Sequence, residues 1–168
     1  MSDGLSPADI LGTLQTYLTA FLATQKGKVS VADDAWNALE LLANSPGTFL
    51  VILHWAGDTA DPEDGDLDGI VDSHIEVIVR QSKRPVAAPG KDLVADGPLQ
   101  PSFYKLMSQV RAKVRAWRAT AGDTTNFGQY FYKGAEYLLH PADGLPLRAI
   151  KLKFDLKHAL STDDGTGD

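Results

Sequence analysis

The chain of 168 residues contains no cysteine, which excludes disulfide bonds, thiolate zinc sites and cysteine nucleophiles. It has no run of about 18 apolar residues, so we expect no membrane-spanning helix. The first residues lack a basic stretch followed by an apolar one, and we therefore expect no secretory signal. Glycine loops for phosphate, serine nucleophile elbows and paired-histidine helix motifs are also missing. These absences favour a non-enzymatic protein of a reducing cytoplasm.

The composition is that of a globular protein, with 43% hydrophobic and 23% charged residues. This length fits one domain with a sizeable core. We predict a single domain over residues 1–160. Residues 161–168 are small and acidic, and we expect them to form a disordered tail.

Charge is divided unevenly along the chain. Residues 1–102 carry 6 Lys/Arg and 15 Asp/Glu, whereas residues 103–160 carry 10 Lys/Arg and 4 Asp/Glu. The net charge of −6 therefore conceals an acidic front half and a basic back half. Such a subunit can attract copies of itself, or face an acidic partner on one side.

Three stretches have the spacing of amphipathic helices. The first covers residues 6–24, with Ser6 as N-cap and Asp9 placed to complete a capping box. A repeated start signal at Ser30 predicts a shorter helix over 31–43. Ser102 opens a third helix to about residue 119, whose apolar side chains fall in a narrow arc.

Four stretches have the pattern of β-strands, over residues 48–55, 73–82, 128–139 and 146–158. The last has the clearest alternation, because Ile150, Leu152, Phe154 and Leu156 alternate with charged residues. A long loop is expected over 83–101. We predict an α+β fold, with a mostly antiparallel sheet of about four strands flanked by helices.

Residues 58–72 form an acidic loop in this prediction. Asp64, Asp66 and Asp68 match the first half of a calcium loop, but Ile75 stands where the bidentate glutamate belongs. The simpler interpretation is a solvated turn without a metal or cofactor. A third is an electrostatic role, in which the loop faces a partner or lines a channel. The candidate residues for that role are Asp61, Glu63, Asp64, Asp66 and Asp68.

The third helix is basic and has no acidic residue. Arg111, Arg115 and Arg118 follow an i, i+4, i+7 spacing beside the apolar stripe, so they share one flank. They are candidates for a subunit interface, together with Lys151 and Lys153 of the last strand. A solvated helix face is the simpler alternative. Nucleic-acid binding is less favoured, because the chain is acidic and aromatic residues do not interleave with the basic ones.

The order of elements resembles the tail-terminator and tail-completion proteins of long-tailed bacteriophages. The resemblance lies in the leading helix, the hairpin of 49–55 and 73–81, the helix at 102–119, and the closing pair YFYKGAEY (130–137) and LRAIKLKF (147–154). It covers most of the chain by pattern and carries no diagnostic motif. The second helix, the acidic loop and the 83–101 loop look like additions to the family's pattern.

The resemblance implies a structural virion protein of the tail or neck, made in the host cytoplasm and without a cofactor. Such proteins form a ring, usually of six subunits, on the head-proximal end of the tail tube. The ring stops polymerisation of the tube protein and offers a surface to the head connector. DNA passes through its lumen without specific binding.

Three alternatives to a terminator remain open from the sequence. The nearest is a head–tail connector or another neck or tail component of similar architecture. A small calcium-binding module would rest on Asp64, Asp66 and Asp68. An enzyme would require a site assembled across the fold, for example from His54, His74 and His140 with nearby acids.

Overall fold

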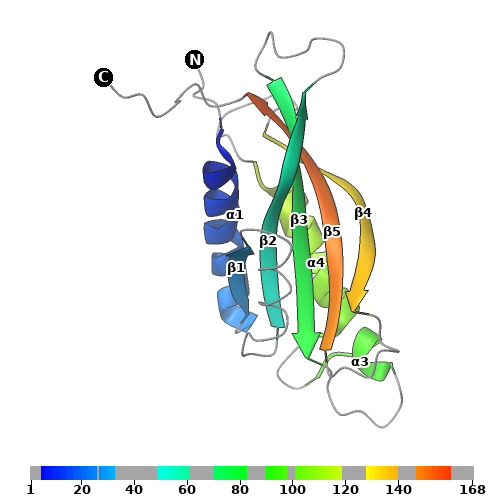
Figure 1. The fold of residues 1–168 in the computed structure, drawn as a ribbon. Helices are drawn as coiled ribbons and strands as arrows, with labels where there is room; N and C mark the ends of the chain where they lie inside the picture. The colour runs from blue at the N-terminus through cyan, green and yellow to red at the C-terminus, as the bar shows by residue number, and fades with distance from the viewer. Residues whose placement is uncertain are drawn as a thin grey trace.

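The computed structural model describes residues 5–25, 27–32, 49–60, 70–82, 90–97, 101–118, 128–139 and 147–159. Figure 1 shows helices α1, α3 and α4, a short 3₁₀ turn after α1, and five strands. Their bounds are α1 Pro7–Leu22, η1 Ala23–Gln25, β1 Lys28–Ala32, β2 Phe49–Ala60, β3 Ile70–Ser82, α3 Lys91–Val94, α4 Phe103–Ala116, β4 Tyr130–Leu139 and β5 Leu147–Ala159. Within these residues, no helix is long and apolar enough to span a bilayer.

The strands form one sheet in the order β1-β2-β3-β5-β4. β1 runs parallel to β2, and every other neighbouring pair is antiparallel. The predicted α+β class is confirmed, with five strands rather than about four. The hairpin of β2 and β3 is also confirmed. It is longer than predicted, since its strands reach Ala60 and Ile70 and so take up both ends of the expected acidic loop.

The additional strand is β1, and it corrects the prediction of a helix start at Ser30. Residues 28–32, which include Ser30, are extended and pair with β2. Val29 lies opposite Val51, and Val31 lies opposite Leu53. Burial of Val29 beside a central strand outweighs the local capping signal, because β-branched residues fit a pleated, half-buried surface. The rest of the predicted second helix, residues 33–43, lies outside the described residues.

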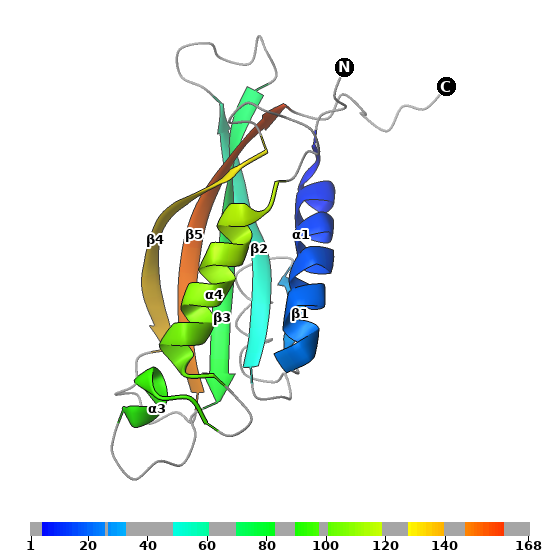
Figure 2. The same ribbon diagram turned by 180° about the vertical axis from the view of Figure 1, so that it is seen from behind.

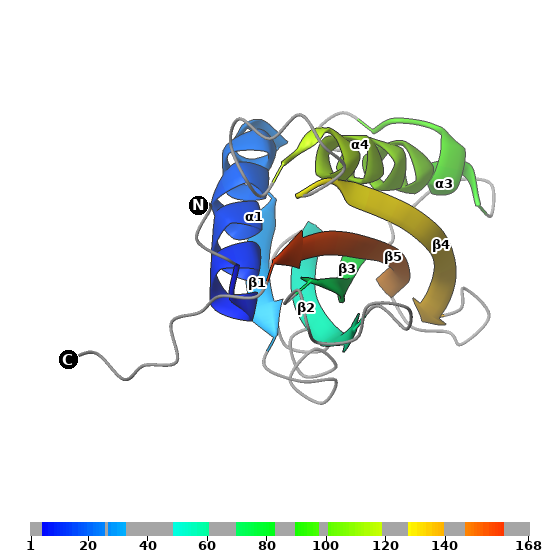
Figure 3. The ribbon, with the colours of Figure 1, turned by 90° about the horizontal axis from the view of Figure 1, so that it is seen from above.

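Helices α1 and α4 lie side by side on one face of the sheet (Figures 2 and 3). The capping box of Ser6 and Asp9 begins α1 as predicted, and the Ser102 hydroxyl caps α4. The core lies between the helices and the sheet. It contains the alternating residues of β3 (Ile75, Val77, Val79) and β5 (Ile150, Leu152, Phe154, Leu156), which confirms their predicted burial.

Helix α4 ends at Ala116, three residues before the predicted end. Trp117 is extended, and its ring stacks on Tyr17 of α1 with 4.3 Å between ring centroids. Arg118 forms an isolated bridge with Gln129 instead of continuing the helix. The i, i+4, i+7 stripe predicted from the sequence is therefore wrong at Arg118, and only Arg111 and Arg115 belong to the helix surface.

A smaller apolar cluster lies on the opposite face of the sheet. It contains the buried residues Ala32, Leu50, Ile52, Ile78 and Ala149. Of the predicted 83–101 loop, the structure describes α3 and its flanks. A buried ion pair between Asp92 of α3 and Arg148 of β5 holds α3 against the end of the sheet.

Candidate functional site

The face of the sheet opposite the helices carries a row of paired charges across four strands. His54 Nδ1 lies 2.9 Å from Oε2 of Glu76, whose Oε1 lies 2.9 Å from the Lys151 amine. The row continues to Glu136, which lies 3.4 Å from Lys151 and 2.8 Å from Lys153. We call these five residues the ion-pair row. In the register of the sheet, His54 lies opposite Glu76, and Lys151 lies opposite Glu136. Residues that lie opposite each other share a face of the sheet, so acids and bases alternate along the row.

The contacts within the ion-pair row favour the charged forms of Glu76, Glu136 and Lys151. Burial by itself would raise the pKa of the Glu76 carboxyl, but hydrogen bonds and charges from His54 and Lys151 together lower it. Burial would lower the pKa of the Lys151 amine, but Glu76 and Glu136 together raise it. The hydrogen bond from Lys153 lowers the pKa of the exposed Glu136 carboxyl. The interface candidates Lys151 and Lys153 thus already have carboxylate partners within the subunit.

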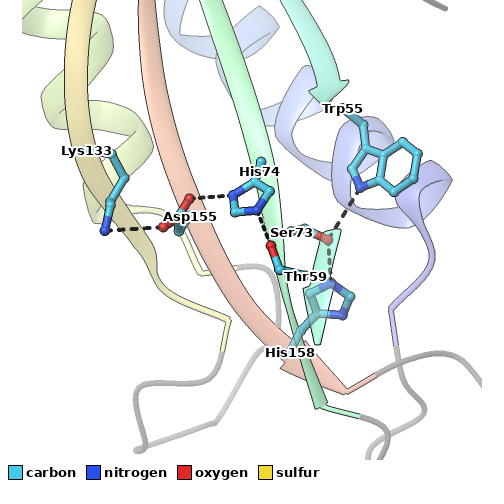
Figure 4. Close-up of polar contacts among 7 residues, drawn as sticks. All are labelled: Trp55, Thr59, Ser73, His74, Lys133, Asp155 and His158. Carbon is cyan, nitrogen blue, oxygen red and sulfur yellow. Dashed lines mark hydrogen bonds and ion pairs between the residues drawn. The ribbon is translucent and has the colours of Figure 1, made fainter. Parts of the chain in front are cut away.

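A second polar row lies beside the first, nearer the end of the β2–β3 hairpin (Figure 4). His74 Nδ1 is 2.8 Å from Oδ1 of Asp155, and Lys133 is 3.4 Å from Oδ2 of the same carboxylate. The second nitrogen of His74 contacts the Thr59 hydroxyl. The structure thus pairs His54 and His74 with separate acids rather than with one another, while His140 lies outside the described residues.

The surface of α4 differs from the sheet face because three of its cations have no acidic partner among the described residues. Arg111 lies over the Tyr132 ring and Lys113 over the Phe21 ring, each 5.2 Å from the ring centroid. Arg115 is exposed. Among the described residues, these three cations have no carboxylate within ion-pair distance, whereas Lys105 at the start of α4 pairs with Asp96 at 2.6 Å. Arg111 and Arg115 lie one turn apart on the same side of the helix, whereas Lys113 lies on the other side, toward α1. We call Arg111 and Arg115 the α4 basic face.

Aromatic rings from other elements accompany two of these cations in the fold. Phe21 comes from α1 and Tyr132 from β4, so neither is close to the basic residues in sequence. Cation–π contact holds the long side chains in place without neutralising their charge. The packing of α1 and β4 beside α4 brings these rings to the cations. This packing could not be predicted from the sequence of α4 alone.

The structure also joins Ser73 and His158, a pair that the sequence did not indicate. The Ser73 hydroxyl is 2.7 Å from His158 Nε2, and Nδ1 of His158 is 2.8 Å from the Ala159 carbonyl oxygen. The Trp55 indole contacts Ser73 from the other side at 3.4 Å (Figure 4). Ser73 and His158 are only 1% and 3% exposed. A substrate could not reach the hydroxyl without local opening, so we assign the pair a structural role.

The acidic candidates Asp61, Glu63, Asp64, Asp66 and Asp68 lie outside the described residues, and so does the proposed calcium loop. Within the described ranges, no group of three His, Cys, Asp or Glu residues is arranged to hold a metal ion. The candidate functional surfaces of the described residues are therefore the ion-pair row, the second polar row and the α4 basic face.

No model of a known protein family matches the chain, and no curated protein matches it at a significant level.

Proposed function

We propose that this chain is a structural protein of a bacteriophage virion, a tail terminator that forms a ring at the head-proximal end of the tail tube. The observation that carries the proposal is the dissimilarity of the subunit's surfaces. Within the part of the chain that the structure describes, Arg111, Lys113 and Arg115 of α4 have no acidic partner, whereas the cations of the ion-pair row are compensated. A closed ring needs a head-to-tail contact, in which two different surfaces of identical subunits meet.

The two edges of the sheet support the same proposal. One edge is β1, with five residues in parallel pairing, and the other is β4, a strand of ten residues of which eight are in antiparallel pairing. β4 is interrupted by irregularities at Tyr132/Gly134 and Tyr137/Leu139. Bulges on an edge strand hinder the addition of another strand. We therefore expect subunits to meet through side-chain surfaces rather than through one continuous sheet.

In this proposal the ring binds the tail tube protein on one side and a head-proximal connector protein on the other. DNA passes through the lumen without sequence-specific contacts. The protein is made in the host cytoplasm and becomes part of the virion neck. A head–tail connector of similar architecture would also form a ring, but it would not bind the end of the tube.

Light scattering and negative-stain microscopy of the purified chain test the proposal. Six subunits of 18.1 kDa make a ring of about 109 kDa. We expect such rings to bind tail tubes at one end and to stop addition of tube protein there. Rings that do not bind the ends of tail tubes, but bind the phage head, would favour the head–tail connector function instead. A chain that forms no ring, alone or on tubes, would refute both functions.

A further inference from the structure

The α4 basic face is built to receive an anionic partner. α4 contains no acidic residue, and Arg111 and Arg115 lie about 6 Å apart along the helix axis, on the same side of the helix. Like charges placed on one side of a helix at this spacing repel one another. A bound carboxylate would relieve this repulsion, and no described carboxylate of the same subunit is close enough to do so.

The long side chains of this face are partly ordered before any partner binds. Arg111 rests on Tyr132, which restricts its rotamers and leaves its charged group at the surface. Arg115 lies in the last turn of α4, where a cation interacts favourably with the helix dipole. This dipole is too weak to cancel its charge. Pre-ordering of these side chains lowers the entropy that a partner must overcome.

The chain itself contains a segment of complementary charge. Residues 61–69 carry five carboxylates and no basic residue. They connect the ends of β2 and β3, which project past the ends of α1 and α4 at one end of the molecule (Figures 1 and 2). The ends of β2 and β3, to which residues 61–69 are joined, therefore lie beyond the helices of their own subunit.

We propose that residues 61–69 of one copy bind the α4 basic face of the next copy. The inference rests on the proposed ring, because it names the two surfaces of the head-to-tail contact. A second copy is the occupant that the chain itself supplies, because its residues 61–69 carry five carboxylates and no basic residue, a charge complementary to this face. Each copy carries one segment 61–69 and one α4 basic face, so the two surfaces are present in equal numbers.

Charge exchange tests the contact. One variant carries Arg111→Glu and Arg115→Glu, and the other carries Asp64→Lys, Asp66→Lys and Asp68→Lys, which changes the charge of residues 61–69 from −5 to +1. We expect each alone to need at least about tenfold more protein to form rings, because like charges would meet at every interface. An equimolar mixture should regain rings, since each reversed surface then meets its complement in alternating subunits. The control is Lys105→Glu with Lys133→Glu, the same charge change at cations that already have partners, which should retain rings.

Cross-linking gives a second measurement, and the absence of native cysteine removes any background. The single variants Asp66→Cys and Arg115→Cys, mixed and mildly oxidised, should form a covalent dimer. The chain that carries both cysteines should form covalent oligomers. If that chain closes an internal disulfide and stays monomeric, the segment binds its own helix and the inference is wrong.

The outcomes separate this contact from the ring itself. Rings that form equally well with either reversed variant would overturn the α4 contact and leave the ring standing. Neither rings nor intermolecular disulfides in the unreversed chain would overturn both. Duplex DNA that binds the wild-type chain and fails to bind the Arg111→Glu, Arg115→Glu variant, with ring formation unchanged, would assign the face to nucleic acid instead.

Discussion

Ser73 and His158 form a buried hydrogen bond of 2.7 Å between β3 and β5, across 85 residues of sequence. In the neutral form of His158, the neighbours of the pair fix the direction of donation. The Ala159 carbonyl can only accept, so Nδ1 of the neutral ring carries the proton and Nε2 accepts from Ser73. The Trp55 indole can only donate, and it donates to the Ser73 oxygen. Every polar atom of this chain of contacts therefore has a partner.

Replacement of Ser73 by alanine should destabilise the protein by about 1–3 kcal/mol, because Nε2 of His158 would stay buried without a donor. Urea unfolding measures this loss. The double variant Ser73→Ala, His158→Leu removes the orphaned nitrogen, and its loss should be smaller than the sum of the two single losses. Additive losses would mean that the hydrogen bond is not what stabilises this site.

Local signals predicted the elements whose structure depends on near neighbours. The Ser6–Asp9 capping box and the alternation along β5 depend on residues within a few positions, and both are present. Contacts that depend on distant pairing were missed. β1 forms only because β2 lies beside it, and the partners Glu76 and Lys151 come from strands that adjoin only in the folded sheet. The early end of α4 likewise follows from the stacking of Trp117 on Tyr17.

Gly27 lies between η1 and β1, and its backbone passes close to the buried side chain of Phe49. A Cβ atom at this position would be 2.2 Å from Cε2 of Phe49, whose ring is 1% exposed and cannot easily move. We expect Gly27→Ala to lower the free energy of unfolding by about 1–3 kcal/mol.

Gly12 provides the matched control for this substitution. It lies within α1 on the exposed side, and a Cβ there would meet nothing within 4 Å. Gly12→Ala should therefore raise the stability by about 0.5–1 kcal/mol, as expected for alanine inside a helix. Thermal unfolding of both variants measures whether the midpoint falls for Gly27→Ala and rises for Gly12→Ala. A rise for Gly27→Ala would contradict the close approach to Phe49.

The ion pair between Asp92 and Arg148 should hold α3 in place, because both side chains are less than 10% exposed. Asp92→Asn would leave the guanidinium of Arg148 without its counter-charge, at a cost of about 3–5 kcal/mol. Hydrogen exchange at residues 91–95 should rise more than in the sheet. Asp96→Asn is the control, since its pair with Lys105 is half exposed and such pairs contribute about 0–1 kcal/mol. Equal effects of the two variants would argue against a special role for the buried pair.

Glu76 gives the ion-pair row a defined pH dependence. Burial opposes ionisation of its carboxyl, but His54 and Lys151 together hold its pKa below the ordinary value of 4.5. A carboxyl with a lowered folded-state pKa contributes stability above its unfolded-state pKa, and this contribution is lost as the pH falls through the folded-state pKa. Glu76→Gln should therefore cost about 1 kcal/mol at pH 7, as expected for a partly exposed hydrogen-bonded pair.

Below the lowered pKa of Glu76, the wild-type chain and the Glu76→Gln variant should have the same stability, because both side chains are then neutral. Urea unfolding between pH 7 and pH 3 measures the closing of this difference. Glu136→Gln, in the exposed part of the same row, should change stability less at every pH. A difference for Glu76→Gln that stays constant down to pH 3 would mean that packing or hydrogen-bond geometry, rather than the charge on Glu76, stabilises the row.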